Sequence, residues 1–285
     1  MRFALCLAVL FLMAGPVSPA FPQKCDGPCT IDGPDGGTYE VLEPDGWDGV
    51  TTLPVLIWYH GWQRTGKYVL RNKRTGGVTR KKGVLLIAPN GVGKSWSMPV
   101  WKGRDGRDDL AFTRRLLTDV KRRWPIDENR VWIAGFSLGG SMAWYVACEM
   151  GSLADAFFPV SGVFWRPHPE ACPDPARRLS HVHGTADTVM PLDGRSFDDG
   201  ARQGNVFQSV AVMRAAQGFG VEPDRHIRDG IRDCDIWENA ETGQSLELCL
   251  HPTGHNIPDD WVARSIDKAN RRAGFVQAAG QEDGG

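Results

Sequence analysis

The chain carries no charge excess of either sign and, after its first twenty residues, no long apolar run. Among 285 residues, 33 are Lys or Arg and 34 are Asp or Glu, so the formal net charge is -1 at pH 7. Proteins whose main partner is nucleic acid or an anionic membrane usually carry a basic patch or excess. No segment beyond the N-terminus is apolar for long enough to span a bilayer. We therefore expect neither nucleic acid nor a membrane among the partners of the mature protein.

The sequence also lacks internal repeats and Ser/Thr/Pro-rich linkers. Its length fits one or two domains, and 41% apolar residues with 11 Trp argue against disorder. We expect one catalytic domain over residues 51–276, preceded by an extension with the first strands at 21–50. Residues 277–285 are expected to form a flexible tail. The whole is expected to be a monomer.

The first twenty residues are typical of a signal peptide. Arg2 precedes a short apolar run over 3–14, and small residues at Ser18 and Ala20 favour cleavage after Ala20. The alternative is a retained anchor, but the run is too short to cross a bilayer. The protein is therefore expected to be secreted or periplasmic.

Removal of residues 1–20 would take Cys6 away and leave six cysteines. An even number of cysteines in an exported chain indicates disulfides, although six allow 15 connectivities. Their order suggests three local pairs: Cys25 with Cys29, Cys148 with Cys172, and Cys234 with Cys249. Cys25 and Cys29 could instead form half of a zinc site, but no Cys/His pair follows at matching spacing. We expect no bound metal.

Apolar runs rich in β-formers alternate with helical patterns along the chain. The runs suit parallel strands that are buried on both faces, and the patterns between them repeat every three to four residues. The expected strands are 55–59, 84–88, 131–134, 157–161 and 179–183, and the expected helices are 110–124, 142–149 and 210–217. This alternation predicts an α/β fold with a mostly parallel central sheet flanked by helices. Residues 233–238 and 245–250 could form a hairpin or two separated strands, and the basic segment 71–82 is expected to be a solvated loop.

A serine sits where an expected strand gives way to a helix. The pentapeptide Gly135–Gly139 around Ser137 follows one apolar run and precedes a helical one. A nucleophile elbow has this order, with small residues beside the serine. The alternative is a glycine-rich turn with an idle serine. The context predicts Ser137 as a nucleophile.

A second loop, His60-Gly61-Trp62, follows the first expected strand. The backbone N–H of Trp62 in this loop and that of Leu138, directly after Ser137, would together stabilise the oxyanion of an acyl-transfer reaction. The alternative is an ordinary strand-to-loop turn.

An acid and a base follow two later strands. Asp187 ends the segment His183–Asp187 and is expected to orient an imidazole, whereas Asp193 lies further into the loop. A turn residue that bonds its own backbone is the alternative role for Asp187. His255 lies in a loop after 245–250, while His251 belongs to the strand end. A lone histidine is more often structural, but the order Ser137, Asp187, His255 is that of the α/β-hydrolase triad.

With these motifs, the chain resembles the secreted esterases grouped as polyhydroxybutyrate depolymerases and feruloyl esterases, the LpqC-like branch of the α/β-hydrolases. The resemblance spans about residues 53–261. Its motifs are His60-Gly61, Ser95-Trp96 before Asp108-Asp109, 126–131 leading into 135–143, 160–162, 183–187 and Gly254-His255. The chain departs from the family pattern at Trp62 and Asn256, both close to the expected acyl or alcohol pocket.

The resemblance implies ester hydrolysis without a metal or organic cofactor, and disulfides at Cys148–Cys172 and Cys234–Cys249. The expected function is an exported serine carboxylesterase that hydrolyses short-acyl, hydroxyalkanoate or aryl (feruloyl-type) esters through an acyl-enzyme. Its partner would be a small-molecule or oligomeric ester. One alternative is a serine peptidase of the prolyl-oligopeptidase type. This alternative is weakened because the chain has no room for the propeller domain of such peptidases. The other is an inactive hydrolase scaffold that only binds, which the complete triad disfavours.

Three tryptophans lie in loops that follow strand ends, where such folds build their sites. Trp62, Trp96 and Trp101 are expected to form a flat apolar wall for an aromatic acyl group or a sugar face. The alternative is that these rings pack as loop core.

Overall fold

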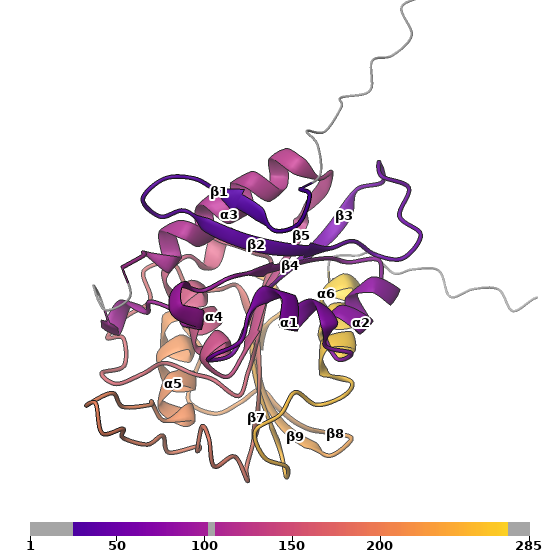
Figure 1. Ribbon diagram of the computed structural model, residues 1–285. Helices are drawn as coiled ribbons and strands as arrows, with labels where there is room; N and C mark the ends of the chain where they lie inside the picture. Colours follow the sequence, from indigo (N-terminus) through magenta and orange to yellow (C-terminus); the bar gives the residue numbers. More distant parts are fainter. Residues whose placement is uncertain (1–24, 102–105, 273–285) are drawn as a thin grey trace, which may run out of the picture.

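The computed structural model describes residues 25–101 and 106–272 (Figure 1). The expected signal peptide at 1–20, residues 273–276 of the expected domain and the tail at 277–285 lie outside the described residues. One ten-stranded sheet has the order β1-β2-β4-β3-β5-β6-β7-β10-β9-β8. The strands are β1 (Cys29–Ile31), β2 (Gly37–Leu42), β3 (Leu53–Tyr59), β4 (Leu85–Pro89), β5 (Ile126–Phe136), β6 (Ala156–Val160), β7 (Arg178–Gly184), β8 (Arg225–Asp229), β9 (Arg232–Asn239) and β10 (Gln244–His251).

The centre of the sheet is parallel and its two edges are antiparallel. Strands β4, β3, β5, β6, β7 and β10 run in one direction, and β2 and β9 pair antiparallel with the two ends of this block. Every residue of β3, β4 and β6 is buried, because both faces of the sheet are covered. The five strands expected from apolar runs are confirmed, and so is the α/β fold.

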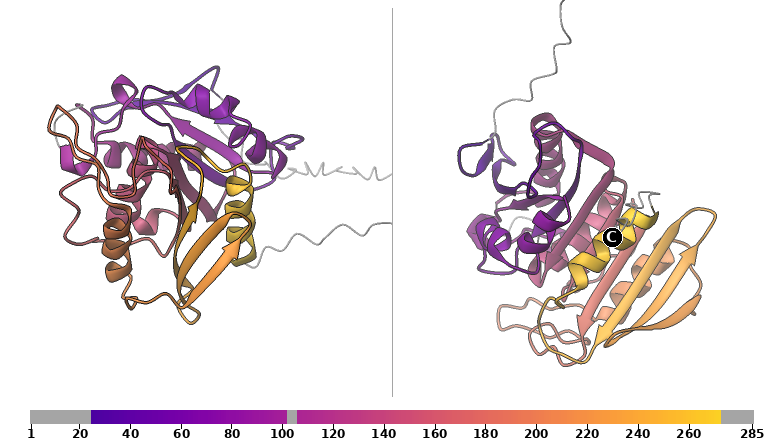
Figure 2. Two further views of the ribbon diagram at one scale, coloured as in Figure 1. Left: turned by 90° about the horizontal axis from the view of Figure 1, so that it is seen from below. Right: turned by 90° about the vertical axis from the view of Figure 1, so that its right-hand side faces the viewer.

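Helices cover both faces of the sheet. The α-helices are α1 (Gly66–Arg71), α2 (Gly76–Lys81), α3 (Asp109–Arg123), α4 (Leu138–Glu149), α5 (Val206–Ala216) and α6 (Trp261–Arg272), and short 3-10 helices are η1 (Val92–Lys94), η2 (Pro99–Trp101) and η3 (Gly151–Leu153). The apolar side chains of α3, α4 and α5 pack into one core, and those of α1, α2 and α6 pack into a second core across the sheet. Figure 2 shows α5 and α6 on opposite sides of the strands.

The basic segment 71–82 is not the solvated loop expected from its sequence, because it contains α2. Buried threonines fix this short helix: Thr75 Oγ1 donates to Val69 O at 2.7 Å, and Thr79 Oγ1 donates to Thr75 O at 3.1 Å. The lysines and arginines occupy its outward positions. A six-residue helix is not stable by propensity alone, so tertiary contacts decide its conformation.

The last strands form a hairpin, which resolves the two arrangements left open by the sequence. Strand β9 pairs antiparallel with β10, and Cys234 faces Cys249 across the pair. These two cysteines form a disulfide, as do Cys25 with Cys29 and Cys148 with Cys172. The three pairs are those suggested by the order of the cysteines. Among the described residues, no helix has both the length and the apolar character needed to cross a membrane.

Candidate active site

Ser137 occupies a sharp turn between β5 and α4. Its backbone has φ 59° and ψ -123°, a conformation that L-residues rarely adopt. Two glycines allow the chain to pass so closely: a Cβ on Gly135 would lie 2.1 Å from Gly139 O, and one on Gly139 would lie 2.1 Å from Tyr59 O. The turn therefore has the geometry of a nucleophile elbow, with Ser137 held in a strained backbone by its surroundings.

The loop after β3 lies directly against this elbow. A Cβ on Gly61 would contact Ser137 Cβ at 3.5 Å. Leu138 is the first residue of α4, so its N–H lacks a partner within the helix and points from the positive end of the helix dipole. The structure thus brings the loop of Trp62 and the amide of Leu138 to the same corner of the molecule.

His60 fixes the shape of this loop, a role that the sequence did not reveal. Its Nε2 accepts a hydrogen bond from Gly91 N–H at 3.0 Å, and its Nδ1 donates to Gly61 O at 2.8 Å. Burial lowers the pKa of His60 to about 4, so the ring is neutral at pH 7. A neutral ring with one donor and one acceptor matches these two partners.

Trp96 supports the same loop from inside the protein and does not face substrate. Its ring is fully buried, and its indole N–H donates to His60 O at 2.7 Å. The expectation of a substrate-binding role for Trp96 is therefore corrected: the loop after β4 turns this ring into the core, where its N–H finds a carbonyl partner. Trp62, in contrast, is 66% exposed.

Asp187 is buried in the turn after β7 and bonds both its own turn and an imidazole. Its Oδ1 accepts from the N–H groups of Val189 and Met190, each at 2.8 Å, and its Oδ2 accepts from His255 Nδ1 at 2.7 Å. Burial raises the pKa of Asp187, but the hydrogen bonds from His255 and Met190 outweigh burial and lower it overall. The carboxylate is therefore ionised at neutral pH. The hydrogen bonds to its own turn, which were the alternative, and the hydrogen bond to an imidazole therefore occur together.

The rival residues have other partners. Asp193 Oδ1 accepts from Asn205 Nδ2 at 3.0 Å. His251 ends β10, is buried, and bonds Thr253 Oγ1 through Nδ1 at 2.7 Å. The loop that carries His255 reaches the acid turn because Gly184 has no side chain: a Cβ there would lie 2.2 Å from Thr253 O.

His255 meets the elbow through Phe136, the residue before Ser137. The two ring centroids are 4.7 Å apart, and both Ser137 and His255 line one cavity. The structure thus gathers Ser137, Asp187 and His255 from three different strand ends at the carboxyl edge of the parallel sheet.

Two cavities of different chemistry meet at Ser137, with Trp62 and Val189 lining both. We call the first, of about 430 Å³, the aromatic pocket. It is lined by Trp62, Ser95, Trp101, Ser137, Leu138, Trp165, Val189, Met190, Arg195, Phe197, Asp199, Ala201 and Gln203. We call the second, of about 380 Å³, the polar pocket, and besides His255 its lining includes Arg64, Tyr68, Asn72, Arg74, Thr75 and Asn256.

The aromatic pocket contains rings that the sequence did not reveal as site residues. Trp101 packs edge-on against Trp165 with the ring centroids 4.5 Å apart, and Trp165 stacks with Phe197 with the ring centroids 5.6 Å apart. Trp165 and Phe197 belong to the long connections after β6 and β7, where no local motif marks them. Their proximity to Ser137 results from the parallel sheet order.

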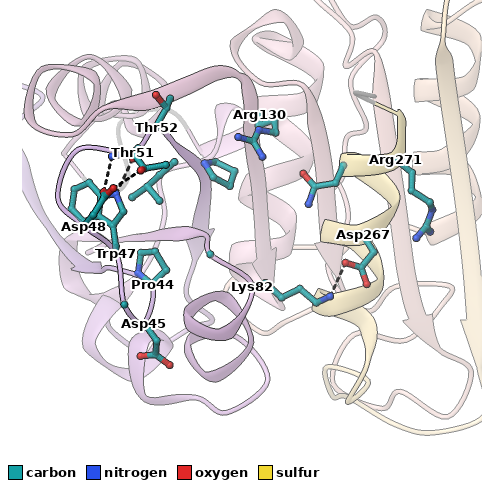
Figure 3. A pocket seen from close by; sticks show the side chains of 15 residues that line it. Pro44, Asp45, Trp47, Asp48, Thr51, Thr52, Lys82, Arg130, Asp267 and Arg271 are labelled. Carbon is teal, nitrogen blue, oxygen red and sulfur yellow. Dashed lines mark hydrogen bonds and ion pairs between the residues drawn. The ribbon is translucent and has the colours of Figure 1, made fainter. Parts of the chain in front are cut away.

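A larger cavity of about 680 Å³ lies at the other end of the parallel strands, where β3 and β4 begin (Figure 3). It is bounded by Leu53 at the start of β3, Gly83 before β4, and Arg271 near the end of α6. Figure 3 shows its Asp48 bonded to Thr51 and its Lys82 paired with Asp267. None of the expected catalytic residues reaches this cavity.

Within residues 25–101 and 106–272, one cluster has side chains of metal-binding type, namely Cys234, Glu247 and Cys249. Both cysteines are joined in a disulfide, and Glu247 is paired with Arg264 and Lys268 at 2.8 Å each. The cluster therefore offers no thiolate, and its carboxylate is already neutralised.

The known proteins similar to this chain include several esterases. No protein-family model matches it. Feruloyl esterase B of Piromyces equi is 26% identical over 75% of this chain. The chain spans less than half the length of the first curated relatives that it matches: 42% of that protein and 20% of the bifunctional acetylxylan esterase/xylanase XynS20E of Neocallimastix patriciarum.

Solved structures of esterases share the fold of this chain. The acetyl xylan esterase from Aspergillus awamori superposes with a TM-score of 0.64 at 15% identity, over 88% of this chain and 100% of that one. The feruloyl esterase module from Clostridium thermocellum, solved as a mutant with sinapinate, gives 0.54 at 13% identity, over 90% and 92%. The chain therefore has the α/β-hydrolase fold, and the resemblance to feruloyl esterases seen in its sequence is confirmed by curated relatives of that name.

Proposed function

We propose that this protein is an exported serine carboxylesterase that hydrolyses aryl and short-acyl esters through an acyl-enzyme on Ser137. The observation that carries the proposal is the elbow of Ser137 beside His255, whose Nδ1 donates to the buried carboxylate of Asp187. A serine, an imidazole and an ionised acid in this relation form the apparatus of acyl transfer.

In the proposed reaction, His255 Nε2 accepts the hydroxyl proton of Ser137 while Ser137 Oγ attacks the ester carbonyl carbon. The N–H groups of Leu138 and Trp62 stabilise the oxyanion, and Asp187 stabilises the imidazolium. His255 then returns the proton to the leaving alcohol oxygen, which leaves an ester on Ser137. A water molecule, deprotonated by His255, attacks the carbonyl carbon of that ester, and His255 returns the proton to Ser137 Oγ as the bond to the acyl group breaks and the acid is released.

The linings of the two pockets support one orientation of the ester substrate. The group that protonates the leaving alcohol must lie beside it, and His255 lines the polar pocket but not the aromatic pocket. The alcohol portion therefore occupies the polar pocket, whose arginines and asparagines suit a hydroxylated alcohol such as a sugar. The acyl portion occupies the aromatic pocket, where Trp101 and Phe197 provide apolar faces.

Three features support aryl esters and export. Aromatic rings pack favourably on one another beyond simple area burial, and a cavity of about 430 Å³ falls in the usual range for small-molecule sites. Relatives and a structural neighbour bear the name feruloyl esterase. Three disulfides suit an oxidising compartment, as does the expected signal peptide.

The test is hydrolysis of methyl ferulate and 4-nitrophenyl acetate by the wild type and by Ser137→Ala. The substitution should lower kcat by about 10⁴-fold or more, since only the nucleophile is removed. Ser152→Ala, on the surface helix η3, is the matched control and should keep the full rate. If Ser137→Ala retained more than about a tenth of the rate, the nucleophile would be another group.

A further inference from the structure

Two buried histidines on β7 lie outside the proposed triad but are connected to it. His181 and His183 point to the same face of the strand, because they are two residues apart, and neither is exposed to solvent. A buried polar ring is costly unless each nitrogen finds a partner. The partners of these two rings therefore show what the rings do.

The hydrogen bond of His183 to a carbonyl fixes its tautomer. His183 Nε2 lies 2.6 Å from Met190 O, so Nε2 carries the proton and donates it. Burial lowers the pKa of His183, which keeps the ring neutral at pH 7 and leaves Nδ1 without a proton. Nδ1 must then accept, and His181 Nε2 donates to it at 3.0 Å.

The same reasoning continues into the helix of the nucleophile. Burial lowers the pKa of His181 well below its usual value, so this ring is neutral too, and its Nδ1 accepts from Trp144 Nε1–H at 3.2 Å. Pro159 O, 3.1 Å from the same Nδ1, receives no proton from the ring in this arrangement. Trp144 lies on α4, which begins directly after Ser137. The donors therefore all point in one direction, from α4 towards the turn after β7.

The last donor of this chain reaches the acid. His183 Nε2 is 3.6 Å from Asp187 Oδ2, the oxygen that accepts from His255. It also holds the carbonyl of Met190, whose N–H donates to Asp187 Oδ1 at 2.8 Å. The His183 ring thus lies close to one oxygen of the carboxylate and holds the residue whose N–H binds the other oxygen.

We propose that His183, oriented by His181 and Trp144, is a positioning residue that aligns Asp187 with His255. This inference rests on the proposed function. The hydrogen bonds tie the acid turn to the helix that begins at the nucleophile, so that the three triad residues keep one relative geometry. Misplacing a catalytic group by about 1 Å can cost on the order of 10²-fold in rate.

The experiment compares His183→Leu with His183→Gln. Leucine removes the donor, and kcat for 4-nitrophenyl acetate, per active site titrated by the acyl-enzyme burst, should fall by about 10- to 100-fold with KM nearly unchanged. The amide nitrogen of glutamine occupies the place of Nε2 and should restore most of kcat. Leu179→Ala is the matched control: it removes buried volume from the same strand face without touching the hydrogen bonds, and should lower the melting temperature but not kcat.

A second readout does not depend on turnover. The proton shared by His255 Nδ1 and Asp187 should give a downfield resonance in the proton NMR spectrum of the wild type, and His183→Leu should shift or broaden it while Leu179→Ala leaves it in place. Unchanged kcat and resonance in His183→Leu, or an equal loss of kcat in Leu179→Ala, would overturn the positioning role. A wild type without esterase activity, in which His183→Leu still shifts the resonance, would instead reject the proposed function and leave the positioning role intact.

Discussion

Trp62 offers a way to separate what a side chain contributes from what its backbone contributes. Its N–H is one of the two proposed oxyanion donors, whereas the residue as a whole is 66% exposed and lines both pockets. Trp62→Ala removes the indole and keeps the N–H. Because most of the ring already faces solvent, the substitution leaves no buried cavity and should not change the free energy of unfolding by more than about 0.5 kcal/mol.

The magnitude follows from the contact that the ring can make. Packing of an aryl group against an aromatic side chain contributes about 0.5–1.5 kcal/mol beyond area burial. For a ring that remains two-thirds exposed, the lower half of that range applies, so KM for methyl ferulate should rise about two- to fivefold. The acetyl group of 4-nitrophenyl acetate is too small to stack in the aromatic pocket, so kcat for this ester should be unchanged and its KM should rise less.

The assay is steady-state hydrolysis of both esters by the wild type, Trp62→Ala and Val189→Ala. Val189 lines the same two pockets and is 42% exposed, but it carries no ring, so its truncation controls for a simple widening of the junction. Equal changes in KM for both esters would refute a stacking role of Trp62. A large fall in kcat for both would show that the ring holds the oxyanion loop in place.

Two further predictions concern stability. The pKa of His60 is lowered to about 4, so neutral His60 contributes about 3 kcal/mol to the free energy of unfolding, which is present above pH 6.5 and lost as the pH falls towards 4. Urea unfolding should therefore give a lower free energy of unfolding at pH 4.5 than at pH 7, and the difference should be smaller in His60→Gln. An equal or higher value at pH 4.5 would contradict this prediction. The Cys234–Cys249 disulfide joins residues 15 apart, so its removal by a double Ala substitution should lower the free energy of unfolding by about 2–4 kcal/mol. An unchanged urea midpoint would show that the pairing of β9 with β10 is enough to hold these strands in place.

The residues of the proposed triad stand out in the sequence because their signals are local. The glycines around Ser137 are required by backbone contacts within a few residues and by the neighbouring strand, and the order of serine, acid and histidine follows from the fold. The positions of Trp96 and Phe197 could not be predicted in this way. Whether a loop ring faces the core or a pocket depends on which carbonyl or ring it meets, and those partners come from distant segments.

The histidines of β7 are an intermediate case. Their spacing of two residues in a buried strand places both rings on one face, which follows from strand alternation once the strand over 179–183 is assigned. The direction of their hydrogen bonds was not, because it depends on Trp144 and Met190, which belong to other elements. Similarly, the edge strands β1 and β2 and the helix α2 form through pairing and packing with the central block rather than through strong patterns of their own.

The cavity of about 680 Å³ marks an end of the protein that is suited to attachment to a solid support. The last turn of α6, with Asn270 and Arg271, borders this cavity, whereas Ser137, which follows β5, lines the aromatic pocket and the polar pocket. A tether joined to that turn would lie at the end of the sheet where β3 and β4 begin, whereas Ser137 follows the last residue of β5 (Figure 1 labels these elements). Immobilised in this orientation, the protein would present the aromatic pocket and the polar pocket to the solution.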